Sequence, residues 1–337
     1  MREIYEPDQK AHLSVDADDR VRAIRHSEAF WESDQDSPVD VAIEYLRQHA
    51  EIYGVPESQL GQLGEDVEFL NPVEEDVSYR TSEVKGHFDA YTVGFNQTYL
   101  NTPIWRAGFK VTVKQDPNRV VYSVDTSHTE VEAGLPAQEE VSRHASVFIA
   151  TDVQRMRAGE GEAPDEEVHS AGSEFLKGIF APTGMAALNE DEQEQEFEMV
   201  RGRFWVYQYY SEERLPAVDH DGGEVHDADR GPIPPLGDVP DTFEDGQHYF
   251  VSEVTFKSRA GGYRRTWRAL VDVETDTVLY LRSLSGNVNG LVFKDDPITK
   301  TGNVANNSAS SSTTLNALRD DVEMLNLNAP SAGQQAL

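Results

Sequence analysis

The sequence predicts an α+β protein of two modules, each a helix packed on a curled antiparallel sheet, followed by a flexible C-terminal linker. Two observations carry this prediction: apolar residues recur at helical spacing in two segments, and alternating strand-like segments follow each of them. The order of helix and then strands therefore occurs twice. A chain of 337 residues is also long enough for two or three domains.

The first helix is marked at both of its ends. Ser37 supplies an N-cap hydroxyl, and Pro38 follows at a position where a missing backbone N–H costs nothing. Gly54 is suited to end the helix after Tyr53. Between these ends the apolar residues at helical spacing are Val39, Ile43, Leu46 and Ala50. This pattern indicates one amphipathic helix that lies on a flat surface.

Strands with one buried face follow this helix. Apolar residues occupy alternate positions in 91–99, apart from Gln97, and more regularly in 105–113 and 120–124. Turns are expected near Asn101 and at 115–118, so the three segments form an antiparallel meander. Gln97 interrupts an apolar face and is expected to hydrogen-bond the backbone at the adjoining turn, because a buried amide needs partners.

The second module repeats this order. Pro136 opens a helix whose apolar stripe contains Val141, Ala145, Phe148, Ile149, Val153 and Met156. A further helical segment is expected near 173–188, and strands at 204–210, 249–256, 267–273 and 278–281. The predicted organisation is thus an N-terminal hairpin lead-in (1–36), module 1 (37–130), module 2 (131–293), and a linker and tail (294–337). Within the tail, 303–316 is rich in Asn, Ser and Thr, and a short helix is expected near 315–325.

The composition excludes several classes of function. With 61 acidic and 29 basic residues the formal charge is −32, so nucleic acid and anionic membranes are poor partners. No apolar run is long enough to cross a bilayer, and the first residues show no signal peptide. The chain has no Cys, which excludes disulfides and thiolate chemistry. The acid-rich, Lys-poor composition suits a halophilic source, although a soluble acidic protein has the same composition.

Sequence motifs for catalysis are also missing. No two of the ten His are four residues apart, so there is no HExxH zinc motif. Neither a GxSxG segment nor a phosphate-binding GxxxxGK(S/T) loop occurs. Carboxylate pairs say little in so acidic a chain. The sequence therefore predicts a protein that is not an enzyme and has no cofactor.

Four segments resemble the pro-regions of secreted zinc metallopeptidases. YLRQHAEIYGVPESQL (45–60) and FNQTYLNTPIWRAGFKVTV (95–113) are similar to the propeptide domain of fungalysin- and thermolysin-type peptidases (FTP). WRALVDVETDTVLYL (267–281) is similar to the closing hairpin of a PepSY domain, although the usual turn glycine is replaced around Asp276. NGLVFKDDPITKTG (289–302) resembles the segment that joins such a propeptide to its peptidase. The residues that match are Phe95, Gln97, Tyr99, Pro103, Trp105, Trp267 and Asp272.

This resemblance implies two FTP/PepSY-like modules in a secreted protein. It also implies that the chain binds and inhibits a zinc metallopeptidase catalytic domain, in cis or in trans, and assists its folding as an intramolecular chaperone. An alternative is a stand-alone secreted or particle-associated structural protein that uses such modules for assembly. A divergent enzyme is the third possibility, against which the missing motifs speak.

Three groups of residues are candidates for binding. An aromatic surface around Trp205, Tyr207 and Tyr209 is a candidate partner-binding face. A basic cluster that includes Arg259, Arg264 and Arg265 is either a hairpin turn paired with acidic neighbours or a docking site for an acidic partner. An acidic loop offers oxygen ligands of the kind that Ca²⁺ prefers, but a solvated hairpin tip would have the same composition. Its candidate ligands are Asp219, Asp221, Glu224 and Asp227.

Overall fold

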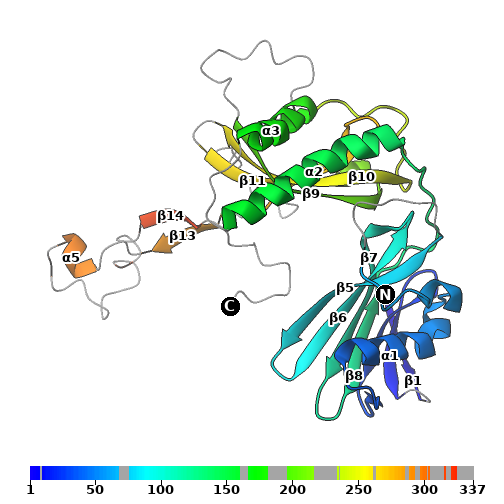
Figure 1. Cartoon of the computed structure of the whole chain (residues 1–337). Coiled ribbons are helices and arrows are strands. Elements are labelled where there is room, and N and C mark those ends of the chain that lie inside the picture. Colours follow the sequence, from blue (N-terminus) through cyan, green and yellow to red (C-terminus); the bar gives the residue numbers. More distant parts are fainter. Residues whose placement is uncertain are drawn as a thin grey trace.

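The protein is α+β, as predicted, and is built around one large, mostly antiparallel sheet (Figure 1). The computed structural model describes residues 1–7, 10–67, 76–159, 166–180, 196–215, 234, 236–260, 263–284, 288–292, 297–301, 303, 315 and 320–324. Twelve of the described strands belong to this sheet, and a separate pair lies apart from it. None of the described helices is long and apolar enough to cross a membrane.

Module 1 is one helix on a sheet with strand order β1-β2-β3-β8-β7-β6-β5. Its strands are β1 (Arg2–Glu6), β2 (Ala11–Val15), β3 (Val21–His26), β4 (Trp31–Glu32), β5 (Ser78–His87), β6 (Ala90–Tyr99), β7 (Thr102–Lys114) and β8 (Arg119–Asp125). The predicted N-terminal hairpin is present as β2 and β3, and β3 pairs with β8. The hairpin thus extends the sheet of module 1. The edge strand β5 was not predicted, because its exposed half is polar and shows no apolar alternation.

The helix of module 1, α1 (Pro38–Tyr53), has both predicted caps. Ser37 Oγ accepts a hydrogen bond from the N–H of Asp40 (3.2 Å), and Gly54 adopts a left-handed conformation (φ 69°). The buried residues of its inner face pack on the sheet, and they include polar side chains. Tyr45 and Tyr53 both hydrogen-bond Ser123 Oγ on β8, at 3.0 and 2.5 Å. These hydrogen bonds fix the helix over one point of β8.

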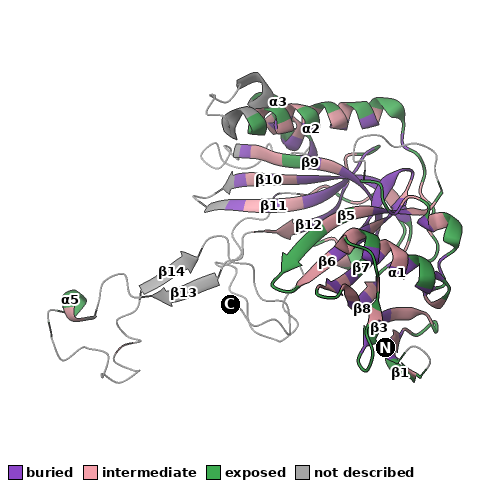
Figure 2. Cartoon of the chain, turned by 60° about the horizontal axis from the view of Figure 1, so that its bottom comes forward, coloured by how far each residue is buried: buried purple, intermediate pink, exposed green. Residues whose placement is uncertain are grey.

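Module 2 has the strand order β9-β10-β11-β12 and two helices on one face of this sheet. The elements are α2 (Gln138–Gly159), α3 (Glu166–Phe180), β9 (Glu196–Gln208), β10 (His248–Ala260), β11 (Tyr263–Asp272) and β12 (Val278–Ser283). Figure 2 shows the two helices lying along the strands, with buried residues on the strands between the layers. Phe148 of α2 packs against Gly202 of β9, where even a Cβ atom would overlap its ring.

The two modules are joined through β7. Ile104 of β7 pairs in parallel with Val206 of β9, so the sheet continues from one module into the other. On one face Leu100, Ile104 and Ala107 belong to the core beneath α2 and α3. On the other face lies an aromatic cluster with rings from β7, β9 and β12, formed around Trp105, Trp205, Tyr207, Tyr209 and Tyr280.

The sheet of module 2 curls around this aromatic cluster. Strand β12 lies four places from β7 in the strand order, which in a flat sheet would be about 19 Å. The ring centroids of Trp105 on β7 and Tyr280 on β12 are nevertheless 6.0 Å apart, as are those of Tyr207 and Tyr280. The face that carries the aromatic cluster is therefore concave.

Two predictions about module 2 and the tail need correction. Only part of the predicted stripe on α2 is buried: Val141 and Phe148 face the sheet, whereas Ile149, Val153 and Met156 are exposed. Helical spacing identified both the buried and the exposed apolar residues, but it could not show which of them face the sheet. In the tail, 320–324 is not helical, since β14 (Asp320–Met324) pairs with β13 (Val288–Val292). A short helix, α5 (Pro297–Thr301), is also described there.

Candidate functional site

The residues that carry the family resemblance lie in the core or at the turns of hairpins. Phe95 and Trp267 are buried, and Trp267 Nε1 donates a hydrogen bond to Ser258 Oγ (3.0 Å). Pro103 and Tyr99 lie at the turn between β6 and β7, whose central residues Leu100 and Asn101 both have positive φ. A two-residue hairpin turn of this kind requires positive φ at both positions.

Gln97 has the backbone partner that its position predicts. Its Nε2 donates to the carbonyl oxygen of His128 (2.9 Å), and the N–H of His128 donates to Gln97 Oε1 (2.8 Å). The partner is 31 residues away, just after β8, and not at the adjoining turn. Gln97 therefore fixes the segment that leads from module 1 to α2.

Asp272 orders the turn between β11 and β12. Its Oδ1 accepts hydrogen bonds from the N–H groups of Glu274 (3.2 Å) and Thr275 (2.9 Å) and from Thr275 Oγ1 (2.8 Å). Asp276, in the same turn, has a positive φ of 55°, where the resemblance leads one to expect glycine. The sequence motif thus marks a turn.

The expected aromatic partner surface is not exposed. Trp205, Tyr207 and Tyr209 are buried in the aromatic cluster, with 7%, 2% and 4% of their surfaces accessible. Apolar and aromatic residues occupy both faces of β9. The sequence therefore could not show that the curled sheet buries the face that carries Trp205, Tyr207 and Tyr209. The prediction that these three rings form an open surface is wrong.

The other predicted binding residues are only partly described. Arg265 is buried (8% accessible), so it is not a free surface cation, and the side chains of Arg259 and Arg264 lie outside the described residues. The acidic loop with Asp219, Asp221, Glu224 and Asp227 lies outside them as well, so its calcium site stays a prediction. Among the residues that the structure does describe, no group of three or more His, Cys, Asp or Glu could hold a metal ion.

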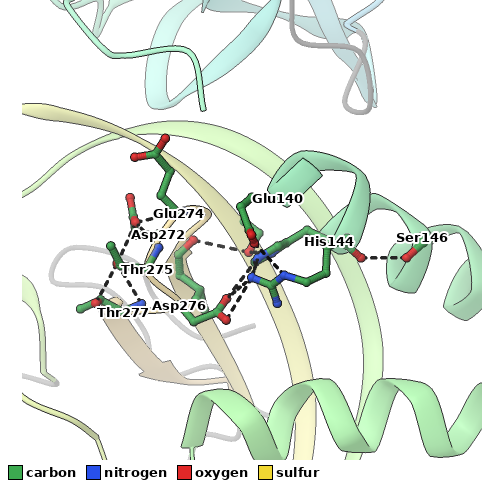
Figure 3. Close-up of polar contacts among 11 residues, drawn as sticks. Glu140, His144, Ser146, Asp272, Glu274, Thr275, Asp276 and Thr277 are labelled. Atoms are coloured by element: carbon green, nitrogen blue, oxygen red, sulfur yellow. Dashed lines mark hydrogen bonds and ion pairs between the residues drawn. The ribbon is translucent and has the colours of Figure 1, made fainter. Parts of the chain in front are cut away.

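Sequence reasoning missed a line formed by Ser252, His144 and Asp276 beneath α2, of which Figure 3 shows His144 and Asp276. His144 Nδ1 lies 3.0 Å from Ser252 Oγ of β10, and its Nε2 lies 3.1 Å from Asp276 Oδ1. Arg143 Nη2 donates to both oxygens of Asp276, at 2.9 and 3.0 Å. Burial alone would raise the pKa of Asp276, but the hydrogen bonds from His144 and Arg143 outweigh it and lower the pKa.

Burial makes this line a structural contact. Ser252 Oγ lies within hydrogen-bond distance of His144 Nδ1 and donates to the carbonyl oxygen of Val271 (3.4 Å). Ser252 and His144 are completely buried, which denies a substrate the access that a nucleophilic Ser–His–Asp site needs. The line therefore anchors α2 to the β11–β12 turn.

A cavity of about 840 Å³ lies where the two modules meet. Strands β3 and β8 and the segment after β8 form one side, and the end of β9 and the turn before β10 form the other. Acidic residues dominate its charged lining, with Asp16, Asp125, Glu130 and Glu132 against Arg22. A volume of this size can hold a small ligand or a peptide segment.

A buried carboxylate is the centre of one wall of this cavity. The side chain of Asp125 is inaccessible to solvent and faces Arg20 Nη2 at 3.5 Å and Arg22 Nη1 at 3.4 Å. Burial raises the pKa of Asp125, although the hydrogen bonds from Ser127 and the two guanidinium charges act to lower it. Arg22 also donates to Asp16 Oδ2 (2.6 Å), and this hydrogen bond lowers the pKa of Asp16.

Two histidines form a contact across the cavity wall. His128 Nδ1, on the segment fixed by Gln97, lies 2.9 Å from His248 Nε2 at the start of β10. Burial lowers the pKa of both rings, with help from Arg22 and Arg20 for His128. Burial and the neighbouring His128 lower the pKa of His248 to about 4. The sequence gave no sign of this pair, because the two histidines are 120 residues apart.

Comparisons with known proteins do not identify a family for this chain. No family model matches the chain, and no curated protein matches its sequence. Among solved structures, the C-terminal domain of YpeB from Bacillus megaterium aligns with 83% of this chain and 80% of its own chain, at a TM-score of 0.28 and 9% sequence identity. Structures that align at so low a TM-score can differ in fold, so this match says nothing about function.

Proposed function

We propose that the chain is a stand-alone structural protein, secreted or associated with a particle, whose two modules act as one partner-binding unit in an assembly. The cavity between the modules is the observation that carries this proposal. It is lined by residues of both modules, so a segment bound there would contact the two modules at once.

The surroundings of the cavity support binding over catalysis. Three of its charged groups hold one another in ion pairs, since Arg22 lies between Asp16 and Asp125. The described Ser–His–Asp line is elsewhere and buried. A preorganised, mostly satisfied surface of this kind favours recognition of a partner segment with little rearrangement.

Self-association tests the proposal. We expect sedimentation velocity to show species larger than one chain at micromolar concentration, more strongly in about 1 M KCl, where screening reduces repulsion between chains of charge −32. Thr129, exposed and on the lining of the cavity, gives a blocking variant, Thr129→Trp, which should reduce this association. Ser142→Trp, on the exposed face of α2, is the matched control and should leave it unchanged. A single-chain mass at every salt and protein concentration would refute the proposal.

The second candidate function is the pro-region of a zinc metallopeptidase, in two FTP/PepSY-like modules. The observation in its favour is the hairpin of 95–104, where Gln97 ties the resembling segment to the path into module 2. A pro-region that binds the folded peptidase stabilises it by mass action. Mixing the chain with a thermolysin-type peptidase should then inhibit cleavage and raise the yield of refolded enzyme. If neither changes at about 10 µM chain, this candidate fails.

A further inference from the structure

The concave face of module 2 carries an unusual concentration of arginines for so acidic a chain. Guanidinium groups lie over the rings of the aromatic cluster: Arg203 over Trp205 (4.6 Å), Arg268 over Trp105 (5.6 Å), and both Arg106 (5.7 Å) and Arg282 (4.3 Å) over Tyr280. These four side chains fall into two pairs that differ in their partners.

One pair is neutralised by a buried acid. Glu253 of β10 accepts from Arg203 Nε (2.6 Å) and Trp205 Nε1 (2.7 Å) through one oxygen, and its other oxygen lies 2.9 Å from Arg268 Nε. Only 2% of Glu253 is accessible. This pair is part of the structure of the cluster and has no capacity left for a ligand carboxylate at those atoms.

The other pair has no such acid. Arg106 Nη2 donates to Tyr280 Oη (2.9 Å), and Arg282 Nη1 donates to the carbonyl of Leu281 (2.7 Å). Within the part of the chain that the structure describes, neither forms an ion pair with a carboxylate. Arg106 is exposed and Arg282 is partly exposed, so solutes can reach both. Arg106 has a left-handed backbone (φ 60°) within β7, and its guanidinium group lies over the ring of Tyr280.

Two buried donors lie unused beside this pair. Tyr207 Oη and Trp105 Nε1 are buried and have no hydrogen-bond partner among the described residues. Arg106 and Arg282 are among the charges that act on Tyr207, together with Glu213, and the ring of Tyr207 lies 6.0 Å from that of Tyr280. Buried polar groups without partners are rare in folded proteins and call for an explanation.

We propose that Arg106 and Arg282, with the hydroxyl groups of Tyr207 and Tyr280, form a site that binds a carboxylate of an acidic peptide. Planar guanidinium groups match a carboxylate in charge and geometry, and a carboxylate oxygen would give Tyr207 the acceptor that it lacks. The faces of the aromatic rings are already covered by arginines, which excludes a cationic ligand. Glu213 repels a dianion more than a singly charged group, which favours a carboxylate over a phosphate. This site is independent of the assembly proposed for the cavity.

Calorimetric titration with short peptides tests the site. The probe is the acetylated, amidated peptide Gly-Glu-Glu-Gly, and the matched ligand control is Gly-Gln-Gln-Gly. About 0.15 M salt keeps the net charge of the chain from masking the local contact, because the Debye length is then about 8 Å. We expect the Glu peptide to bind and the Gln peptide not to bind. Equal binding of the two peptides, or no binding of the Glu peptide, would overturn the proposal. Tighter binding of inorganic phosphate than of the Glu peptide would overturn the assignment to a carboxylate.

Variants distinguish binding at this site from a general effect of net charge on peptide binding. Arg106→Gln with Arg282→Gln should weaken binding of the Glu peptide at least about tenfold. Arg25→Gln with Arg47→Gln removes the same charge from exposed positions of module 1, and it should change binding less than about twofold. Tyr207→Phe should weaken binding several-fold while the melting temperature stays the same or rises, because it removes a buried hydroxyl without a partner. Equal losses in the two double variants would show a general charge effect and refute the site.

Discussion

The helices α1 and α2 lie on the same sheet but are fixed to it by different interactions. Beneath α1 the apolar core contains a hydrogen-bonded cluster, since Ser123 Oγ hydrogen-bonds the hydroxyl groups of Tyr45 and Tyr53, and His26 Nε2 lies 3.1 Å from Tyr45 Oη. Beneath α2 the contact is steric, since Phe148 fills the space that Gly202 leaves. Its polar contacts are gathered in the cluster of His144, Arg143 and Asp276.

This difference has consequences for how each module tolerates change. A hydrogen-bonded contact fails when a partner is removed and a buried group is left unpaired, whereas a steric contact fails when volume is added. The contact of α1 should therefore be sensitive to deletion of polar atoms, and that of α2 to insertion of a methyl group. Three substitutions test this comparison and a fourth tests the junction between the modules, in order of expected effect.

The largest effect is expected for Gly202→Ala. The new methyl group would overlap the ring of Phe148, and such overpacking should lower the free energy of unfolding by about 3 kcal/mol. Chemical denaturation measures this. Gly178→Ala in α3 is the control, because nothing lies within 4 Å of its Cβ position and alanine favours helix. If both variants were equally stable, α2 would not be docked through Phe148.

Ser123→Ala should come next. It leaves Tyr45 and Tyr53 without their shared partner in the core of module 1 and should cost about 2 kcal/mol. Adding Tyr53→Phe in the same chain should recover much of this loss, because Tyr45 keeps His26 Nε2 as a partner and no buried hydroxyl then lacks one. A double variant as unstable as Ser123→Ala would mean that packing, and not hydrogen bonding, holds α1.

The junction between the modules should respond to acid. The pKa of His248 in the folded protein is about 4, below the ordinary value of about 6.5, so the unfolded chain binds a proton first as the pH falls. The contribution of this residue is therefore present above pH 6.5 and lost as the pH falls below it, by about 1 kcal/mol at pH 5.5. Melting temperatures of the protein and of His248→Gln between pH 7.5 and 5.5 measure this. A variant with the same pH dependence as the parent would contradict it.

The smallest effect is expected at the polar end of the α2 contact. Asp276→Asn keeps the left-handed turn but removes the charge that faces Arg143, and should cost about 1 kcal/mol because Asp276 is 36% accessible and screened. The pKa of Asp276 is lowered, so its contribution is present at neutral pH and lost in acid. The two proteins should thus differ at pH 7 and converge as Asp276 is protonated. A constant difference down to pH 3 would contradict an ionic role.

The sequence predicted what depends on neighbours in the chain. The caps Ser37 and Gly54, the alternation in β7 and the need of Gln97 for a backbone partner all follow from short segments. The contacts of the candidate sites join residues that are far apart, such as His128 with His248 and Arg106 with Tyr280, which are 174 positions apart. Such contacts depend on how the sheet curls, and apolar alternation fixes the faces of a strand but not the curvature of its sheet.

Strand β7 has a consequence for how the protein unfolds. Its residues hydrogen-bond β6 and β8 within module 1, and its first half supplies Ile104 and Trp105 to the two cores of module 2. If module 1 unfolds and β7 leaves the sheet, the apolar surface of module 2 that packs on Ile104 and Trp105 becomes exposed. The free energies of the two modules are therefore coupled, and heat or denaturant should unfold them together in one cooperative transition, as a single thermodynamic unit.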